Sequence, residues 1–475
     1  MSGNPGIACI LILCVLLLLS PLNCRADDAC RPALDDKDLD ASIREYVDIL
    51  KRGMTARELA IYYRDQGDAA RKNGLCNKAI IYYGRALGID PDFVDAYLAR
   101  AGVYTDKSLF PAAINDYSKA ITLGIKNTTI YIRRGVAYYK TGKYDKAIID
   151  LSNAILLSPD NATAYTDRGL AYYRNKDYEK ALADYNQAIK LDPQLPEAYY
   201  NRAAAYGDKG LYDQAIADYS RAIELEPGNA AACVNRGIIE RSKGLYDQAI
   251  ADYTKAIELD PRNAIIYINR GIALRSKGLY NRAIADYSRA IELDPANLSA
   301  YINRGNAYYN TGQYAQAKAD FFEATELDPQ FGYACLRLLN AIWELKGDDT
   351  DVMNRLRKYI ASNAAGGVIL SVAEYYASEG SVGEEHVLTP IFRDKDIKRR
   401  TGMLCRAYFF LGVKRLANGN DEGAADYFNK SVETGDTDCD EYYGSKAMLN
   451  RQAPQSHEIP GGEKIASPSG GKKEA

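Results

Sequence analysis

A block of 34 residues returns eight times in register between Ala60 and Phe331, and this period constrains the fold more than any other feature of the chain. Internal similarity at a fixed period of this length is typical of stacked structural units. The seventh and eighth copies differ mostly where a helix would face solvent. The sequence therefore predicts a repeat architecture, in which each unit buries its apolar face against its neighbours.

Small residues recur at fixed positions of the block. Position 8 is Gly or Ala in every copy, and positions 20 and 27 are Ala in every copy. Side chains of this size allow two helices to approach closely. Position 32 is Pro in all copies except the second, where Ile125 replaces it, so the second helix of most units ends before that position.

These motif positions resemble the tetratricopeptide repeat, and the resemblance covers 272 of the 475 residues. It implies an all-α fold, a right-handed superhelical solenoid of antiparallel helix hairpins with a concave inner surface. The eight repeats are expected at residues 60–331.

The amino terminus carries an apolar run from Ile7 to Leu19, which is too short to span a bilayer comfortably. We interpret residues 1–26 as a signal peptide that ends at the small residue Ala26, and we expect a periplasmic or secreted protein. An uncleaved membrane anchor and lipidation at Cys24 are the alternatives, and membrane association is expected only in those cases.

The other segments flank the repeats. Residues 27–59 are expected to form an amino-terminal cap, with an amphipathic capping helix at residues 35–51 and then a capping box of Thr55 and Glu58. Residues 332–400 predict a degenerate helical hairpin and a linker. Residues 401–450 predict a last tetratricopeptide-like unit, and residues 451–475 a disordered tail rich in Gly, Ser, Pro and charge.

The last unit, which begins near Cys405, keeps five motif residues of the repeat, namely Tyr408, Gly412, Gly419, Ala424 and Phe428. It resembles the carboxy-terminal repeat of the periplasmic adaptor lipoprotein NlpI. That resemblance implies a scaffold that brings envelope proteases and peptidoglycan hydrolases together.

Residues typical of catalysis are scarce. The chain has only two histidines, and it contains no phosphate-binding glycine loop and no nucleophile elbow. A net charge of −3 and a pI near 5.8 argue against a nucleic-acid partner. We therefore expect that the protein is not an enzyme and that it binds no metal or cofactor.

Six cysteines follow the expected signal peptide. The disulfides considered are Cys30 with Cys76 and Cys405 with Cys439.

Position 7 of the block is Arg in seven copies, and position 23 is Asp in the same seven. Antiparallel helices would bring the two positions together, so we predict one structural ion pair inside each repeat. Representative members are Arg134 with Asp150, Arg236 with Asp252, and Arg270 with Asp286. The alternative is a row of arginines that binds an acidic ligand, but each Arg has its own counter-charge.

Position 6 faces away from the helix core and is Asn in repeats five to eight. In superhelical arrays such as O-GlcNAc transferase, asparagines at this position hold a peptide by its backbone. We predict a peptide-binding site made of these amides and neighbouring side chains: Asn201, Asn235, Asn269, Asn303, Ile238, Ile272 and Tyr309. The alternative is an ordinary polar surface.

These observations predict a scaffold that binds extended segments of partner proteins in its concave groove and assembles an envelope complex. An accessory protein that binds peptidoglycan or another polysaccharide is the second interpretation, because a Tyr-lined groove can stack sugars. The partner itself is not encoded in any motif.

Overall fold

The computed structural model describes residues 54–363, 367–378, 380–437 and 439–452. The expected signal peptide, the helix expected around residues 35–51 and the tail from residue 453 lie outside the described residues. The described segments contain only helices and connections between them. Internal contacts divide the chain into two units, residues 1–209 and 210–475.

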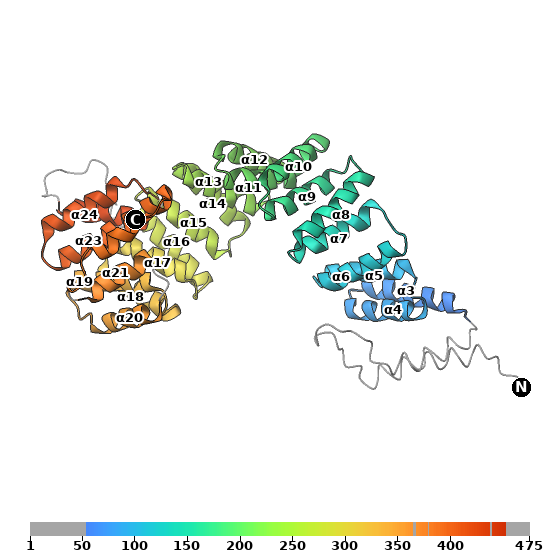
Figure 1. Cartoon of the computed structure of the whole chain (residues 1–475), viewed down its shortest axis with the longest axis horizontal. Helices are drawn as coiled ribbons and strands as arrows, with labels where there is room; N and C mark the ends of the chain where they lie inside the picture. Colours follow the sequence, from blue (N-terminus) through green and yellow to red (C-terminus); the bar gives the residue numbers. More distant parts are fainter. Residues whose placement is uncertain (1–53, 364–366, 379, 438, 453–475) are drawn as a thin grey trace, which may run out of the picture. The chain divides into compact units, whose positions relative to one another are not determined.

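The first unit holds repeats one to four and the first helix of repeat five (Figure 1). Its helices are α3 (Ala56–Lys72), α4 (Cys76–Ile89), α5 (Val94–Asp106), α6 (Phe110–Thr122), α7 (Thr128–Lys140), α8 (Tyr144–Leu157), α9 (Ala162–Arg174), α10 (Tyr178–Leu191) and α11 (Pro196–Asp208). Helix α3 begins with the predicted capping box, because Thr55 and Glu58 bond to each other's backbone N–H groups.

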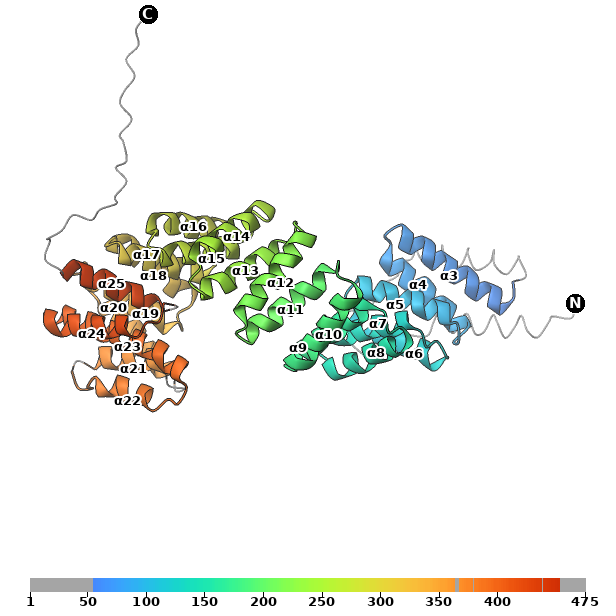
Figure 2. The same cartoon turned by 90° about the horizontal axis from the view of Figure 1, so that it is seen from above.

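The second unit begins with the second helix of repeat five and continues through repeats six to eight (Figure 2). These helices are α12 (Tyr212–Leu225), α13 (Ala230–Ser242), α14 (Tyr246–Leu259), α15 (Ala264–Ser276), α16 (Tyr280–Leu293), α17 (Leu298–Asn310) and α18 (Tyr314–Leu327). After the repeats follow α19 (Gly332–Glu344), α20 (Thr350–Ser362), α21 (Val368–Ala377), α22 (Glu385–Phe392), α23 (Ile397–Ala417), α24 (Asp421–Glu433) and α25 (Asp440–Gln452).

The small motif residues explain the hairpins. A Cβ atom added to Gly271 would lie 2.5 Å from the Tyr287 ring, and one added to Gly305 would lie 2.7 Å from the Phe321 ring. Glycine at position 8 thus leaves room for the aromatic side chain of the second helix. The alanines at positions 20 and 27 have no exposed surface in any of the eight repeats. Each repeat is therefore a closely packed pair of helices, as predicted.

The turn inside each hairpin needs a left-handed residue at position 15. Six repeats place Gly there with φ near 75°, whereas repeats two and four place Ser108 (φ 58°) and Lys176 (φ 62°). Glycine adopts this conformation without steric penalty, and other residues do not. The same backbone turn therefore forms in all eight repeats, with strain at two of them.

The predicted ion pairs are present in both units. Arg134 donates two hydrogen bonds to Asp150, at 2.6 and 2.7 Å, and Arg270 donates two to Asp286, at 2.8 and 2.7 Å. Arg236 binds Asp252 in the same way at 2.6 Å. The Asp side chains are only 3–10% exposed in these pairs. The pairs are therefore bidentate and largely shielded from water.

Each of these arginines also bonds to the preceding repeat, a contact that the repeat comparison did not predict. Its third nitrogen reaches a hydroxyl on the second helix of the previous repeat, as Arg270 does to Thr254 at 3.1 Å. The same contact joins Arg134 to Ser118 at 3.0 Å and Arg236 to Ser220 at 2.8 Å. The ion pair thus fixes the hairpin and also the stacking of one hairpin on the next.

The helices after the repeats form one aromatic core with repeat eight. Phe321, Leu339, Tyr376 and Phe409 are buried in it together. Helix α23 begins at Ile397, inside the segment expected to be a linker, because Asp396 caps it by accepting from the Arg399 N–H at 3.0 Å. Among the described residues, no helix is long and apolar enough to cross a membrane.

Candidate protein-binding surface

The four predicted asparagines occupy equivalent places on the first helices of repeats five to eight. Asn201 lies on α11 in the first unit and is half-buried. Asn235 on α13 and Asn269 on α15 belong to the second unit and are also half-buried. Each therefore keeps part of its side chain at the surface of its own unit.

Apolar side chains accompany the asparagines of α13 and α15. Ile238 and Ile272 are partly exposed, and Ile265 is 61% exposed. Ile238 and Ile272 each rest on the core of their own repeat, so their remaining surface is held in place. Repeats six and seven thus present amides beside aliphatic side chains, a combination suited to the backbone and side chains of a peptide.

Repeat eight differs, and two predicted contact residues are covered there. Asn303 is 8% exposed, and its amide donates to the Ser299 carbonyl at 2.8 Å on the same helix. Tyr309 has no exposed surface, and its ring packs edge-on against Phe409 at a centroid distance of 6.5 Å. The expectation that Tyr309 lines an open groove is therefore corrected. Its side chain belongs to the core shared with α23.

Helix α25 covers this part of repeats seven and eight. Asp440, its first residue, accepts from Arg275 on α15 at 2.5 Å and from Asn306 on α17 at 2.7 Å. At the other end of the helix, Arg451 donates to the Tyr309 carbonyl at 3.0 Å. The chain's own helix thus lies across the first helices of repeats seven and eight.

Electrostatic interactions at the start of α25 favour the charged forms of Asp440 and Arg275. Burial raises the pKa of the Asp440 carboxyl, but the charge and hydrogen bond of Arg275 and the charge of Arg337 outweigh it, so the pKa is lowered. Burial likewise opposes the charge of Arg275, and Asp440 again outweighs it, so the pKa of Arg275 is raised. The contact is therefore a charged pair at neutral pH.

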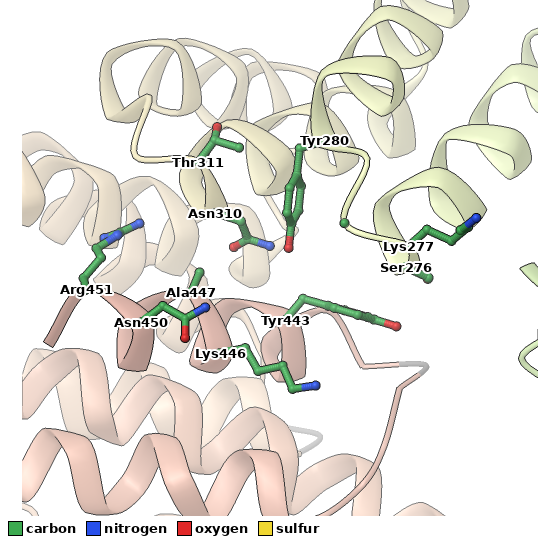
Figure 3. A pocket seen from close by; sticks show the side chains of 11 residues that line it. Ser276, Lys277, Tyr280, Asn310, Thr311, Tyr443, Lys446, Ala447, Asn450 and Arg451 are labelled. Carbon is green, nitrogen blue, oxygen red and sulfur yellow. The ribbon is translucent and has the colours of Figure 1, made fainter. Parts of the chain in front are cut away.

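An open cleft of about 480 Å³ lies between α25 and the repeats. Figure 3 shows Tyr443, Lys446 and Asn450 on the α25 side, across from Tyr280 and Asn310. None of the described residues that line it is acidic. Two cations that line the cleft, Lys277 and Arg451, lie at the carboxyl ends of α15 and α25. Cations there offset the negative end of the helix dipole, so these two need no ligand to explain them.

Arg275, Asn306 and α25 were not among the predicted site residues. A sequence signal existed for Asn306, because position 9 changes from Ile272 in repeat seven to Asn306 in repeat eight. Arg275 gave none, because position 12 is also Arg in repeats one and six. Polar residues that replace apolar ones on the inner face mark a place with a specific partner. Nothing in the repeat period indicates that residues 440–452 are that partner.

Several solved structures are similar to parts of this chain. The structure of MamA is 32% identical and covers 35% of this chain and 96% of its own, with a TM-score of 0.33. YrrB, described as a tetratricopeptide repeat protein with an unusual peptide-binding site, is 22% identical, with coverages of 39% and 95% and a TM-score of 0.36. A repeat protein from Cytophaga hutchinsonii is 21% identical, with coverages of 50% and 98% and a TM-score of 0.43. No curated protein matches the chain.

Family models match the repeats directly. Models described as tetratricopeptide repeat match residues 64–127, 132–196, 196–229 and 299–331, and one described as TPR repeat matches 237–278 and 271–312. Together these matches cover more than half of the 475 residues. With the buried alanines and close-packed hairpins of both units, they show that this chain belongs to the tetratricopeptide repeat family.

Proposed function

We propose that this protein is an exported scaffold that binds extended segments of partner proteins on the concave face of repeats six and seven. The tetratricopeptide repeat is a protein-interaction fold, and assembly rather than catalysis is the activity it supports. The observation that carries the proposal is that the first helices of repeats seven and eight already hold a protein segment, α25, through the side chains of Arg275 and Asn306.

The free energies of the possible contacts indicate different roles for the amides and the isoleucines. Two amide contacts, from Asn235 and Asn269, contribute about 1 kcal/mol each, whereas micromolar binding needs about 8 kcal/mol. Fully burying an exposed isoleucine contributes roughly 1.5–3 kcal/mol. Ile265, which is 61% exposed, has the most surface to lose. In this proposal the isoleucines supply most of the affinity and the amides fix the direction of the bound backbone.

The experiment is a crosslinking capture from envelope extract with the full chain, its Asn235→Ala/Asn269→Ala variant, and a matched control. Gln248→Ala is that control, because Gln248 is an exposed amide on α14, the second helix of repeat six. We expect partners held by the unmodified protein and the control to be lost from the double variant by at least about fivefold. Equal capture by all three proteins contradicts the proposal.

Export and the class of ligand have separate readouts. We expect the mature protein to begin at Asp27 and to be recovered from the envelope or the medium, as the apolar run at residues 7–19 suggests. Recovery of an intact amino terminus in the cytoplasm contradicts export. Competition by glycan fragments but not by peptides would replace the protein-binding proposal with the polysaccharide-binding one.

A further inference from the structure

The beginning of α25 is held differently from the rest of the helix. Gly444 and Met448 pack into the aromatic core, and a Cβ atom on Gly444 would lie 2.7 Å from the Phe409 ring. Asp440 instead makes polar contacts with Arg275 and Asn306, and Glu441 accepts from the Cys439 thiol and lies 3.6 Å from Arg406. The first turn is thus attached by charge, and the later turns by close packing.

Two buried arginines near this first turn, Arg275 and Arg337, have guanidinium nitrogens that α25 does not use. We call Arg275, Asn306 and Arg337 the arginine site. Arg275 is 3% exposed and Arg337 is 1% exposed. By distance and angle, Nε and Nη1 of Arg275 and Nε of Arg337 make no hydrogen bond to the described residues, although the buried Tyr287 hydroxyl interacts with the Arg275 guanidinium. Arg337 is surrounded instead by rings, with Tyr309 at 4.7 Å and Phe409 at 5.0 Å.

These donors indicate which kind of ligand would fit the arginine site better than α25 does. A guanidinium binds a carboxylate most favourably through two parallel hydrogen bonds. Asp440 does not provide them, because one of its oxygens bonds to Arg275 and the other to Asn306. A Glu441 oxygen and the Ser445 hydroxyl are also buried without partners in the described part of the chain. The fit between α25 and the arginine site is therefore incomplete on both sides.

We propose that the arginine site binds an acidic segment of a partner protein, one with two adjacent carboxylates followed by an aromatic or apolar residue, and that the first turn of α25 occupies the site until that segment displaces it. This inference rests on the proposed function and names the chemistry of a second contact. The α25 sequence Asp440-Glu441-Tyr442-Tyr443 is the guide to the motif, since Tyr443 lies under the Arg275 guanidinium at 5.6 Å. Displacement needs only the first turn to move, because the later turns stay packed on α23.

The probe is a fluorescent peptide with the sequence of residues 440–452, added to the full chain and followed by anisotropy. We compare the unmodified protein, the Asp440→Asn/Glu441→Gln variant, and that variant with Arg275→Gln added, each checked by circular dichroism. Removing the charges of α25 vacates the site, so we expect at least tenfold tighter binding to the double variant than to the unmodified protein. Adding Arg275→Gln should return the affinity to the unmodified level.

The matched control is the same peptide with Asn and Gln as its first two residues, which should bind at least tenfold more weakly. The proposal is overturned if adding Arg275→Gln leaves the affinity for the peptide unchanged. It is also overturned if a folded double variant does not bind the peptide. If the double variant does not fold, hydrogen exchange in the unmodified protein decides. Saturating acidic peptide should speed exchange at the first turn of α25, the neutral peptide should not, and equal exchange with both overturns the proposal.

The outcome can be separated from that of the proposed function. Asn235→Ala/Asn269→Ala should leave binding of the α25 peptide unchanged, because neither asparagine belongs to the arginine site. If partner capture depends on these asparagines while the α25 peptide never binds, only the arginine site is contradicted. If the peptide binds through Arg275 while partner capture is unchanged by Asn235→Ala/Asn269→Ala, only the proposed binding of partners to repeats six and seven is contradicted.

Discussion

Repeat seven and repeat eight carry the same ion pair, the same buried alanines and the same glycine beside an aromatic ring, yet their inner faces differ. Ile272 is partly exposed in repeat seven, whereas Asn306, at the same motif position in repeat eight, is 1% exposed under α25. The motif thus determines the interior of a hairpin. What covers the first helix of the hairpin depends on a segment more than a hundred residues later in the chain.

The largest effect should come from the ion pair, and it should be equal in the two repeats. Asp286→Ala in repeat seven and Asp320→Ala in repeat eight each leave a largely buried arginine without its partner, which costs about 3 kcal/mol. Chemical denaturation of each variant measures the loss. Glu258→Ala removes an exposed pair with Lys255 and should cost less than about 0.5 kcal/mol. A similar loss in the control would contradict the distinction between buried and exposed pairs.

The glycine at position 8 gives the next effect. Gly271→Ala and Gly305→Ala each place a methyl group against a ring, at 2.5 Å from Tyr287 and 2.7 Å from Phe321. Overpacking of this kind costs roughly 1–3 kcal/mol, and thermal unfolding measures it. Repeat two already has Ala at this position, so Ala101→Gly is the reverse control. A neutral result in both repeats would show that the rings move aside and that position 8 is not a packing constraint.

Repeat six adds a pH-dependent effect, because position 11 is Glu240 there and Leu274 in repeat seven. Burial raises the pKa of Glu240 to about 7 from a usual value of 4.5, with Asp252 adding to the rise and Arg236 opposing it. The folded state therefore binds this proton more tightly than the unfolded state, and the stability it contributes is lost as pH rises from about 4.5 to 7. Glu240→Gln should stabilise the protein by about 1 kcal/mol at pH 8 and change little at pH 4.

Denaturation of both proteins at the two pH values tests this sign. Greater stabilisation by Glu240→Gln at pH 4 than at pH 8 would contradict the assigned direction. Glu258→Gln, on an exposed residue of the same repeat, should show no comparable pH dependence.

The smallest effect on stability should come from the inner-face asparagines. Asn269→Ala and Asn303→Ala should each change the free energy of unfolding by less than about 0.5 kcal/mol, because neither is required for hairpin packing. Their effects on captured partners should differ, since Asn269 remains partly exposed and Asn303 is turned toward Ser299. A quantitative affinity series with the captured segment measures this difference. Equal losses of affinity would show that repeat eight opens in solution.

Much of the fold followed from the repeat period, because positions 8, 20, 23 and 27 report contacts inside a repeat. The Arg270 to Thr254 bond was missed, since it joins two repeats and requires the stacking geometry. Tyr309 and Asn303 were expected on an open face, because helical phase shows which side of a helix they occupy but not what packs there. Residues 440–452 have no repeat signature, so their contact with Arg275 emerged only in three dimensions.

The most direct measurement is hydroxyl-radical footprinting of the intact protein, read by mass spectrometry at Ile265, Tyr267 and Tyr309. We expect modification of Ile265 and Tyr267 in repeat seven and none at Tyr309 in repeat eight, although tyrosine is more reactive than isoleucine. We also expect a captured partner segment to protect Ile265. Oxidation of Tyr309 at the rate of Tyr267 would contradict this expectation, because it would mean that α25 and the aromatic core do not cover Tyr309 in repeat eight.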